Sequence, residues 1–222
     1  MTMGRVPLHC LFSAVSALLP LAVGIYGARR YRIDMKIFLF FCGMAAFLEG
    51  LTLWMAFAKY NNLWLSHFWT LFEFTSLAYI ISLWQNSFMA ARIIRLSIPV
   101  FWLFSFVEVI FGNFNAFNTF SKGFASLFLA LIAAYSLINL DTKDERSLRT
   151  DFRMWMLSGI LLYYSGNLVI LAGANVVLQH FRKLWLLHSI LNILANLLYA
   201  GGFFWARLQQ RSGGRFSLVR SF

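Results

Sequence analysis

Apolar runs of about twenty residues recur along the whole chain and constrain its fold more than any other feature. A helix needs about 20 residues to cross the hydrocarbon core of a bilayer, which is about 30 Å thick. The chain is 60% hydrophobic and 12% charged, whereas a soluble domain is about half apolar and about one quarter charged. The sequence therefore predicts an all-α integral membrane protein, a multi-pass transmembrane helix bundle whose first partner is the lipid bilayer.

Seven runs are long enough to span the membrane, and the connections between them are short. We expect one domain, residues 1–207, followed by a basic cytoplasmic tail, residues 208–222. The longest connection, 141–153, is predicted to be a solvated turn, and Pro99 is placed near the start of the fourth span, where proline is best tolerated. The predicted spans are roughly 8–28, 37–59, 63–84, 96–112, 120–140, 155–178 and 184–207.

The basic residues predict the orientation. The loops after the first, third and fifth spans, together with the tail, hold fourteen of the 19 lysines and arginines, and the opposite side holds five. The positive-inside rule then places the N-terminus outside and the C-terminus in the cytoplasm of a cell (inner) membrane. The surplus of eleven positive charges is thus explained by the orientation of the chain in the membrane and by attraction to anionic lipid headgroups. No nucleic-acid partner is expected. Cleavage of residues 1–28 as a signal peptide would leave "RRYR" outside, so we expect an uncleaved first span.

Three glutamates, Glu49, Glu73 and Glu108, fall within predicted spans, whereas the five other acidic residues, Asp34 among them, are placed in loops. No predicted span contains a lysine or arginine away from its ends, so no cation is expected beside these carboxyls. An isolated charge at mid-bilayer costs several kcal/mol. Each glutamate should then be protonated, bonded to neutral groups, solvated, or opposite a cationic ligand.

Counting residues places Glu73 about 15 Å below the outer surface and Glu49 at a similar level. Glu108 lies near the outer end of its span, where solvation would suffice. At 100° per residue, Thr70 and Glu73 share one face with Ser66, and His67 flanks that face.

Polar residues also form a stripe in the last span, where His188, Asn192, Asn196 and Tyr199 lie within about 80°. Two roles remain open for Asn192 and Asn196. They line a ligand site, or they form hydrogen bonds across helices that serve packing alone. Together these observations predict a polar intramembrane pocket lined by Glu73, Glu49, His67, His188, Asn192, Asn196, Asn167 and Thr70.

Small residues predict close helix approach. Gly159, Gly166 and Gly173 recur every seven residues in the sixth span, and Gly43 and Gly50 suggest a similar seam in the second. The two cysteines, Cys10 and Cys42, have no CxxC spacing and are expected to be packing residues rather than a disulfide or metal ligands.

Two short motifs carry a resemblance to a known group of proteins. The third span contains "HFWTLFEF" (67–74), and the last span contains "WLLHSILN" (185–192). In these motifs the chain resembles the small, functionally uncharacterised seven-helix proteins of bacterial inner membranes. The resemblance implies a seven-helix fold with a polar centre at Glu73, His188 and Asn192, and it implies no particular activity.

The leading hypothesis is a non-enzymatic protein that binds a small-molecule or lipid-like ligand, as a sensor, a receptor-like component or an accessory subunit of a membrane protein partner. A cationic or hydroxylated ligand would suit the carboxyls, and no cofactor or metal is expected. One alternative is a metal-dependent intramembrane hydrolase or transferase that uses His67, His188 and Glu108 as ligands. Another is a proton- or cation-coupled transporter in which Glu49 and Glu73 titrate.

Overall fold

The computed structural model of the chain describes residues 7–111, 118–140, 145–174 and 181–211. These residues form helices and connecting turns and contain no strand, which confirms the all-α prediction for the described part of the chain. The helices are α1 (Leu8–Ser16), α2 (Leu18–Ile25), α3 (Ile33–Phe57), α4 (Leu63–Leu83), α5 (Phe88–Phe111), α6 (Thr119–Ile138), α7 (Glu145–Thr150), α8 (Phe152–Ala174) and α9 (Phe181–Arg211).

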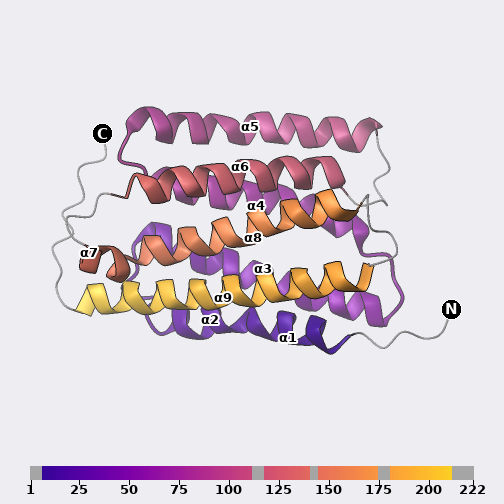
Figure 1. Cartoon of the computed structure of the whole chain (residues 1–222), viewed down its shortest axis with the longest axis horizontal. Helices are drawn as coiled ribbons and strands as arrows, with labels where there is room; N and C mark the ends of the chain where they lie inside the picture. The colour runs from indigo at the N-terminus through magenta and orange to yellow at the C-terminus, as the bar shows by residue number, and fades with distance from the viewer. Residues whose placement is uncertain (1–6, 112–117, 141–144, 175–180, 212–222) are drawn as a thin grey trace.

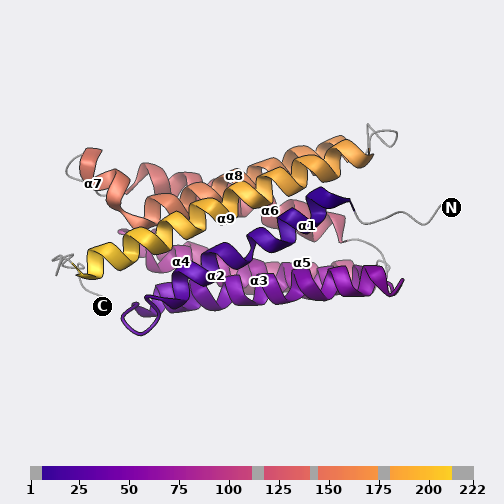
Figure 2. The same cartoon turned by 90° about the horizontal axis from the view of Figure 1, so that it is seen from below.

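The long helices lie side by side in one bundle (Figures 1 and 2). Helices that are close in sequence are neighbours in space, and the ring closes because α1 and α2 both pack against α9. The helix α4 also contacts α6 across the bundle. We call the end where α1, α4, α6 and α9 begin the A end (right in Figure 1), and the opposite end the B end.

Six segments in the described part are long and apolar enough to cross a bilayer: Leu8–Ile25, which comprises α1 and α2, Ile33–Phe57, Phe88–Phe111, Thr119–Ile138, Phe152–Ala172 and Trp185–Gln210. The bundle also exposes many large apolar side chains, such as Phe111 at 85% and Ile138 at 84%. A soluble protein rarely leaves so much apolar surface in water. The chain is therefore built as a multi-pass membrane protein.

The helix α4 is not among the six segments, although it was predicted as the third span. Its polar residues, including His67, Thr70 and Glu73, lower its hydropathy, and these three side chains are buried. A helix whose polar side chains face other helices does not have to dissolve them in lipid. The low hydropathy of α4 thus reflects its position between α3, α5 and α6.

Two helices begin earlier than the predicted spans, and both differences change the surroundings of a residue. The helix α3 begins at Ile33 rather than at 37, so Asp34 lies in its first turn rather than in a loop, and it is buried. The helix α5 begins at Phe88 rather than at 96, so Pro99 lies in the middle of the helix rather than near its start.

The predicted first span is formed by two helices, α1 and α2, which meet at Ala17. Pro20 has no N–H to donate to the carbonyl of Ser16, four residues earlier, so one bond of a continuous helix cannot form there. A carbonyl near the end of α1 still accepts a hydrogen bond, because Ala17 N–H donates to Ala14 O at 3.2 Å.

A tightly packed apolar core fills the middle of the bundle and extends toward the B end. Phe38 of α3 packs edge-on against Tyr199 and Phe203 of α9, and Phe74 of α4 stacks on Phe101 of α5 with ring centroids 4.0 Å apart. Further fully buried side chains of this core are Met35, Leu77, Ile80, Ile81, Leu129, Met156 and Leu157.

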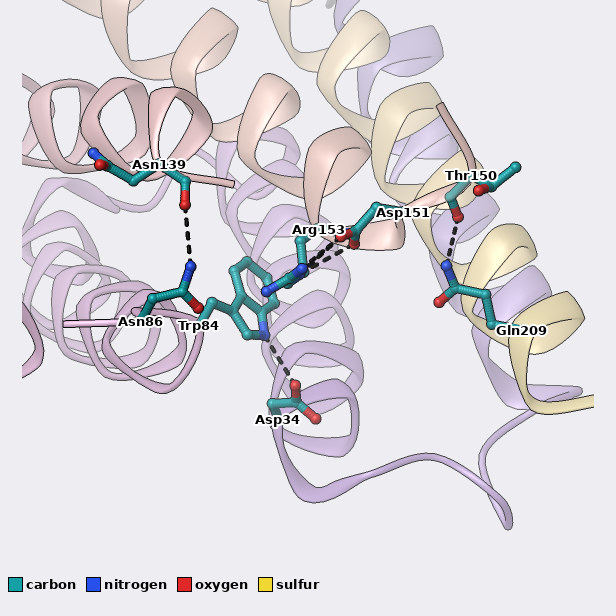
Figure 3. A network of polar contacts seen from close by, with 8 residues as sticks. All are labelled: Asp34, Trp84, Asn86, Asn139, Thr150, Asp151, Arg153 and Gln209. Atoms are coloured by element: carbon teal, nitrogen blue, oxygen red, sulfur yellow. Dashed lines mark hydrogen bonds and ion pairs between the residues drawn. The ribbon is translucent and has the colours of Figure 1, made fainter. Parts of the chain in front are cut away.

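Polar contacts tie the B end together (Figure 3). Trp84 Nε1 donates to Asp34 at 2.9 Å, and Arg153 forms an ion pair with Asp151 at 2.6 Å. Asp151 directly precedes α8 and also accepts from the N–H of Arg153 at 2.8 Å, which is a helix N-cap contact. The predicted solvated turn at 141–153 is therefore wrong in its second half, which contains α7 and the buried Asp151, and 141–144 lie outside the described residues.

Glycines bring α8 and α9 close together. A Cβ atom on Gly159 would lie 2.6 Å from the ring of Tyr199, and one on Gly166 would lie 2.3 Å from Leu191. The surroundings of Gly173 lie outside the described residues. Gly50 of α3 has open space around it, so the second seam suggested by the sequence does not form at that position.

Candidate functional site

Glu73 forms an ion pair with Lys122, which corrects the expectation that no cation lies near this carboxyl. Lys122 Nζ donates to Glu73 Oε2 at 2.5 Å. The side chains of Glu73 and Lys122 are 3% and 12% exposed, so the pair is buried. Tyr164 of α8 lies beside the same carboxyl. Glu73 is thus neutralised within the protein, and a ligand is not required to balance its charge.

The position of the α6 N-terminus explains how Lys122 reaches Glu73. Asn118 directly precedes α6, and its Nδ2 donates to Ser66 O at 3.3 Å and to Thr70 Oγ1 at 2.9 Å. The start of α6 therefore lies beside the second turn of α4 rather than level with its first residue. The first turn of α6 then presents Lys122 to Glu73, one turn beyond Thr70.

Glu108 binds the N-terminus of α6 rather than being left to solvent, as the sequence suggested. Its Oε1 accepts from the N–H of Phe120 at 3.1 Å, and its Oε2 accepts from the N–H of Ser121 at 2.8 Å and from the Ser121 hydroxyl. The N-terminus of a helix carries unpaired N–H groups and partial positive charge, so it stabilises a carboxylate. Glu108 thereby holds the end of α5 against the start of α6.

Glu49 of α3 has neutral hydrogen-bond donors around it, from two other helices. Its Oε1 accepts from Ser13 Oγ of α1 at 3.3 Å and from Asn192 Nδ2 of α9 at 3.2 Å. Asn192 Nδ2 also donates to Ser13 Oγ at 2.8 Å, so the three side chains form one cluster. Glu49 itself is half-buried.

This environment sets Glu49 apart from the other carboxyls whose side chains the structure describes. Each of the other four has a cation or a helix N-terminus as its partner: Glu73 with Lys122, Asp151 with Arg153, Asp34 with Arg32 at 3.6 Å, and Glu108 with α6. Within the described residues Glu49 forms no ion pair. A carboxyl in a membrane helix without a counter-charge is an unusual and costly feature.

Polar side chains of α1 and α9 meet along a line that we call the α1/α9 polar seam. In addition to the Ser13–Asn192 contact, His9 Nδ1 lies 2.9 Å from Ser189 Oγ, and Asn196 Nδ2 donates to Ser16 Oγ at 2.9 Å. The partners ascend together in number, because α1 and α9 run in the same direction. Asn196 therefore bonds between helices, which is the packing role that the sequence left open for it.

His188 and Asn167 form a second pair, between α9 and α8. His188 Nδ1 lies 3.1 Å from Asn167 Oδ1, and the rings of Tyr163 and Trp185 lie about it at 5.8 and 6.0 Å. Asn167 is buried. By their positions along α3, α5, α8 and α9, this pair, Glu49 and Glu108 lie in the A-end half of the bundle, and Glu73 lies at the middle of α4.

His67 is buried in α4. In the described part of the chain, no group of three or more histidine, cysteine, aspartate or glutamate residues is placed to hold a metal ion. His67, His188 and Glu108, the ligand set of the hydrolase alternative, therefore do not form such a group. Cys10 lies 3.5 Å from His9 Nδ1, and Cys42 is buried in the apolar core.

The contributors that were absent from the sequence-based set include Lys122, Asn118, Ser13 and Ser16. A signal existed for the serines, because Ser13 and Ser16, together with His9, repeat at helical spacing on one face of the first span. Lys122 lay inside the predicted fifth span but was taken as an end residue. Its role depends on how far α6 is displaced along α4, which no single-helix pattern contains.

A comparison of the chain with protein-family models, with curated proteins and with solved structures finds no match. The geometry of the carboxyls and their partners therefore carries the functional argument.

Proposed function

We propose that the chain is a seven-span protein of the cell (inner) membrane, with the A end outside and the B end in the cytoplasm. The seven proposed spans include α4, which runs from the A end to the B end of the bundle. Exposed cations of the described chain support the orientation, because Arg29, Arg30, Arg92 and Arg149 lie at the B end and Lys59 lies at the A end.

Single cysteines test this orientation in a cysteine-free background (Cys10→Ser, Cys42→Ala). A membrane-impermeant maleimide applied to intact spheroplasts is expected to label Lys59→Cys, and to label Arg92→Cys only after the membrane is opened. Both positions are exposed, so accessibility differs only by side of the membrane. Labelling of Arg92→Cys in intact spheroplasts would reverse the proposed orientation.

We further propose that the protein is non-enzymatic and binds a small, lipid-like ligand through Glu49, as a sensor, receptor-like component or accessory subunit. The observation that carries this is the absence of any cation beside Glu49 within the described residues, where the other four carboxyls have a positive partner. A ligand with a protonated amine would supply the missing charge. Ser13 and Asn192 hold Oε1 in place, so the carboxyl is oriented before a ligand arrives.

Exposed apolar side chains favour an amphiphilic ligand. Phe12 and Val15 of α1, Phe47 of α3 and Ile190 of α9 are exposed apolar side chains near the Glu49 cluster in sequence, with exposed fractions between 44% and 65%. An alkyl chain can lie against such a surface, which lipid otherwise covers, while its amine reaches Glu49. Burial of the alkyl chain adds affinity in proportion to the apolar area covered.

The partners of Glu49 and Glu73 favour ligand binding over coupled transport. Glu73 is ion-paired with Lys122, whereas Glu49 accepts hydrogen bonds from the neutral side chains of Ser13 and Asn192, so the two carboxyls have different partners.

Thermal unfolding of the full chain in a neutral detergent tests the amine site, with n-octylamine as probe and 1-octanol as its uncharged match. Octylamine is expected to raise the Tm of the wild-type protein in a saturable way, because it binds the folded state. Octanol should have little effect, since it lacks the charge. Glu49→Gln should abolish the response to octylamine.

Glu108→Gln is the matched control, because it makes the same chemical change in the same half of the bundle at a residue outside the Glu49 cluster. Its own Tm is expected to fall, but its octylamine response should persist. Equal responses of wild type and Glu49→Gln, or equal effects of octanol and octylamine, would reject the amine site.

A further inference from the structure

A loop with a fixed shape joins α2 to α3 at the B end. Gly27 N–H donates to Gly24 O at 3.1 Å, and Arg30 N–H donates to Gly27 O at 3.0 Å. Tyr31 anchors the loop to α9, because its hydroxyl donates to Phe203 O at 3.2 Å and its ring stacks on Phe203 at 5.7 Å. A Cβ on Gly27 would lie 2.4 Å from the Tyr31 ring, so this close contact requires glycine.

Burial raises the pKa of Tyr31 above its ordinary value, while Arg207 lowers it by a smaller amount. The phenol therefore stays protonated at neutral pH and keeps its bond to Phe203. The loop is held in one conformation by packing as well as by hydrogen bonds.

The anchored loop presents cations on the surface. We call them the B-end cation cluster: Arg29, Arg30, Arg32, Lys36 and Arg207. The first four are exposed, and Arg207 of α9 lies over the ring of Tyr26 at 5.7 Å. Lys36 lies one helical turn after Arg32, since Lys36 N–H donates to Arg32 O.

The nearby acid neutralises only a small part of this charge. Asp34 is buried, accepts from Trp84 and lies 3.6 Å from Arg32. Five cations against one carboxylate leave a local net charge of about +4, and such a cluster at a membrane surface attracts anionic lipid. Among the described residues Arg29, Arg30 and Lys36 form no ion pair.

Exposed apolar side chains border the cluster. Ile25 ends α2 and is 64% exposed, Tyr26 follows it at 78%, and Ile33 begins α3 at 67%. Cations that alternate with exposed apolar groups at the ends of two membrane helices match the boundary between headgroups and acyl chains. An acidic soluble protein would pair with the cations but would leave the exposed side chains of Ile25 and Ile33 without an apolar partner.

We propose that the B-end cation cluster is a binding site for the headgroup of an anionic phospholipid, with a preference for a lipid that carries two phosphates. The phosphates bind the arginines and Lys36, and the acyl chains lie against Ile25 and Ile33. Arg207 is held by Tyr26, and Tyr31 holds the loop, so the cations are arranged before the lipid binds. This site is separate from Glu49, which lies in the other half of the bundle.

Native mass spectrometry of the full chain in a neutral detergent tests the site. The added lipids are diphosphatidylglycerol with two phosphates, phosphatidylglycerol with one, and zwitterionic phosphatidylcholine. Affinity is expected to fall in that order. Arg29→Gln/Arg30→Gln should weaken diphosphatidylglycerol binding by roughly thirtyfold, at about 1 kcal/mol for each cation.

Arg92→Gln/Arg149→Gln is the control, because it removes two exposed cations from the same end outside the cluster. It should change the affinity by less than about threefold, and both double variants should keep the wild-type Tm, since exposed side chains contribute little to stability. Equal losses in the two variants would show diffuse attraction and overturn the site. Displacement of the lipid by millimolar inorganic phosphate or by a soluble polyglutamate peptide would also overturn it, in favour of a free-anion or acidic-protein site.

Discussion

Replacement of Lys122 by methionine is expected to destabilise the protein by about 3–5 kcal/mol, because it leaves the carboxylate of Glu73 buried without its counter-ion. Glu73→Gln should have a similar effect, because it leaves the Lys122 ammonium buried and unpaired. The double variant Glu73→Gln/Lys122→Met removes both charges and should recover much of the loss. The free energy of unfolding can be measured by denaturing titration in mixed micelles, followed through tryptophan fluorescence.

A double-mutant cycle separates the pair from general effects on packing. Lys59→Met is the matched control, since it makes the same substitution at an exposed lysine of the same end, and it should change stability by less than about 0.5 kcal/mol. Strictly additive losses from Glu73→Gln and Lys122→Met would contradict the ion pair. So would a loss for Lys122→Met no larger than that for Lys59→Met.

The second large effect is expected at the contact between α8 and α9. Gly159→Ala should destabilise the protein by about 1–3 kcal/mol, because overpacking of a filled interface forces a shift of side chains or backbone. The new Cβ would lie 2.6 Å from the Tyr199 ring and 3.3 Å from the backbone oxygen of Ala195. Tyr199 is buried against Phe38, so its ring has little room to move.

Gly166→Ala should cost less, because its neighbour is the end of the flexible Leu191 side chain. Gly50→Ala is the control, since nothing lies within 4 Å of the added Cβ, and alanine should there stabilise α3 by about 0.5–1 kcal/mol. The same unfolding titration ranks the three variants. A Gly159→Ala protein as stable as wild type would contradict the close packing of α8 on α9.

The class of the protein could be predicted from local patterns. Apolar runs of spanning length predicted the helices, and the structure differs mainly at their ends, as at Asp34 and Pro99. Those ends depend on weak local signals, because a helix can extend beyond its apolar run whenever its polar residues find hydrogen-bond partners. Asp34 does so with Trp84, which is fifty positions away in the chain.

Helical phase also indicated which side chains of one helix share a face, and Thr70 and Glu73 do lie buried together on α4. It could not show what they face. For Glu49 the partners are Ser13 and Asn192, and for Glu73 the partner is Lys122, each on a different helix.

The sequence by itself determined that this chain forms membrane-spanning helices and that carboxyls would be buried within them, because length, hydropathy and phase are properties of one helix at a time. Only the tertiary structure decided which carboxyl is neutralised. The displacement of α6 along α4 brings Lys122 to Glu73, and the packing of α1 between α3 and α9 gives Glu49 neutral donors instead. Such displacements depend on the summed packing of many side chains, which no pattern within a single helix records.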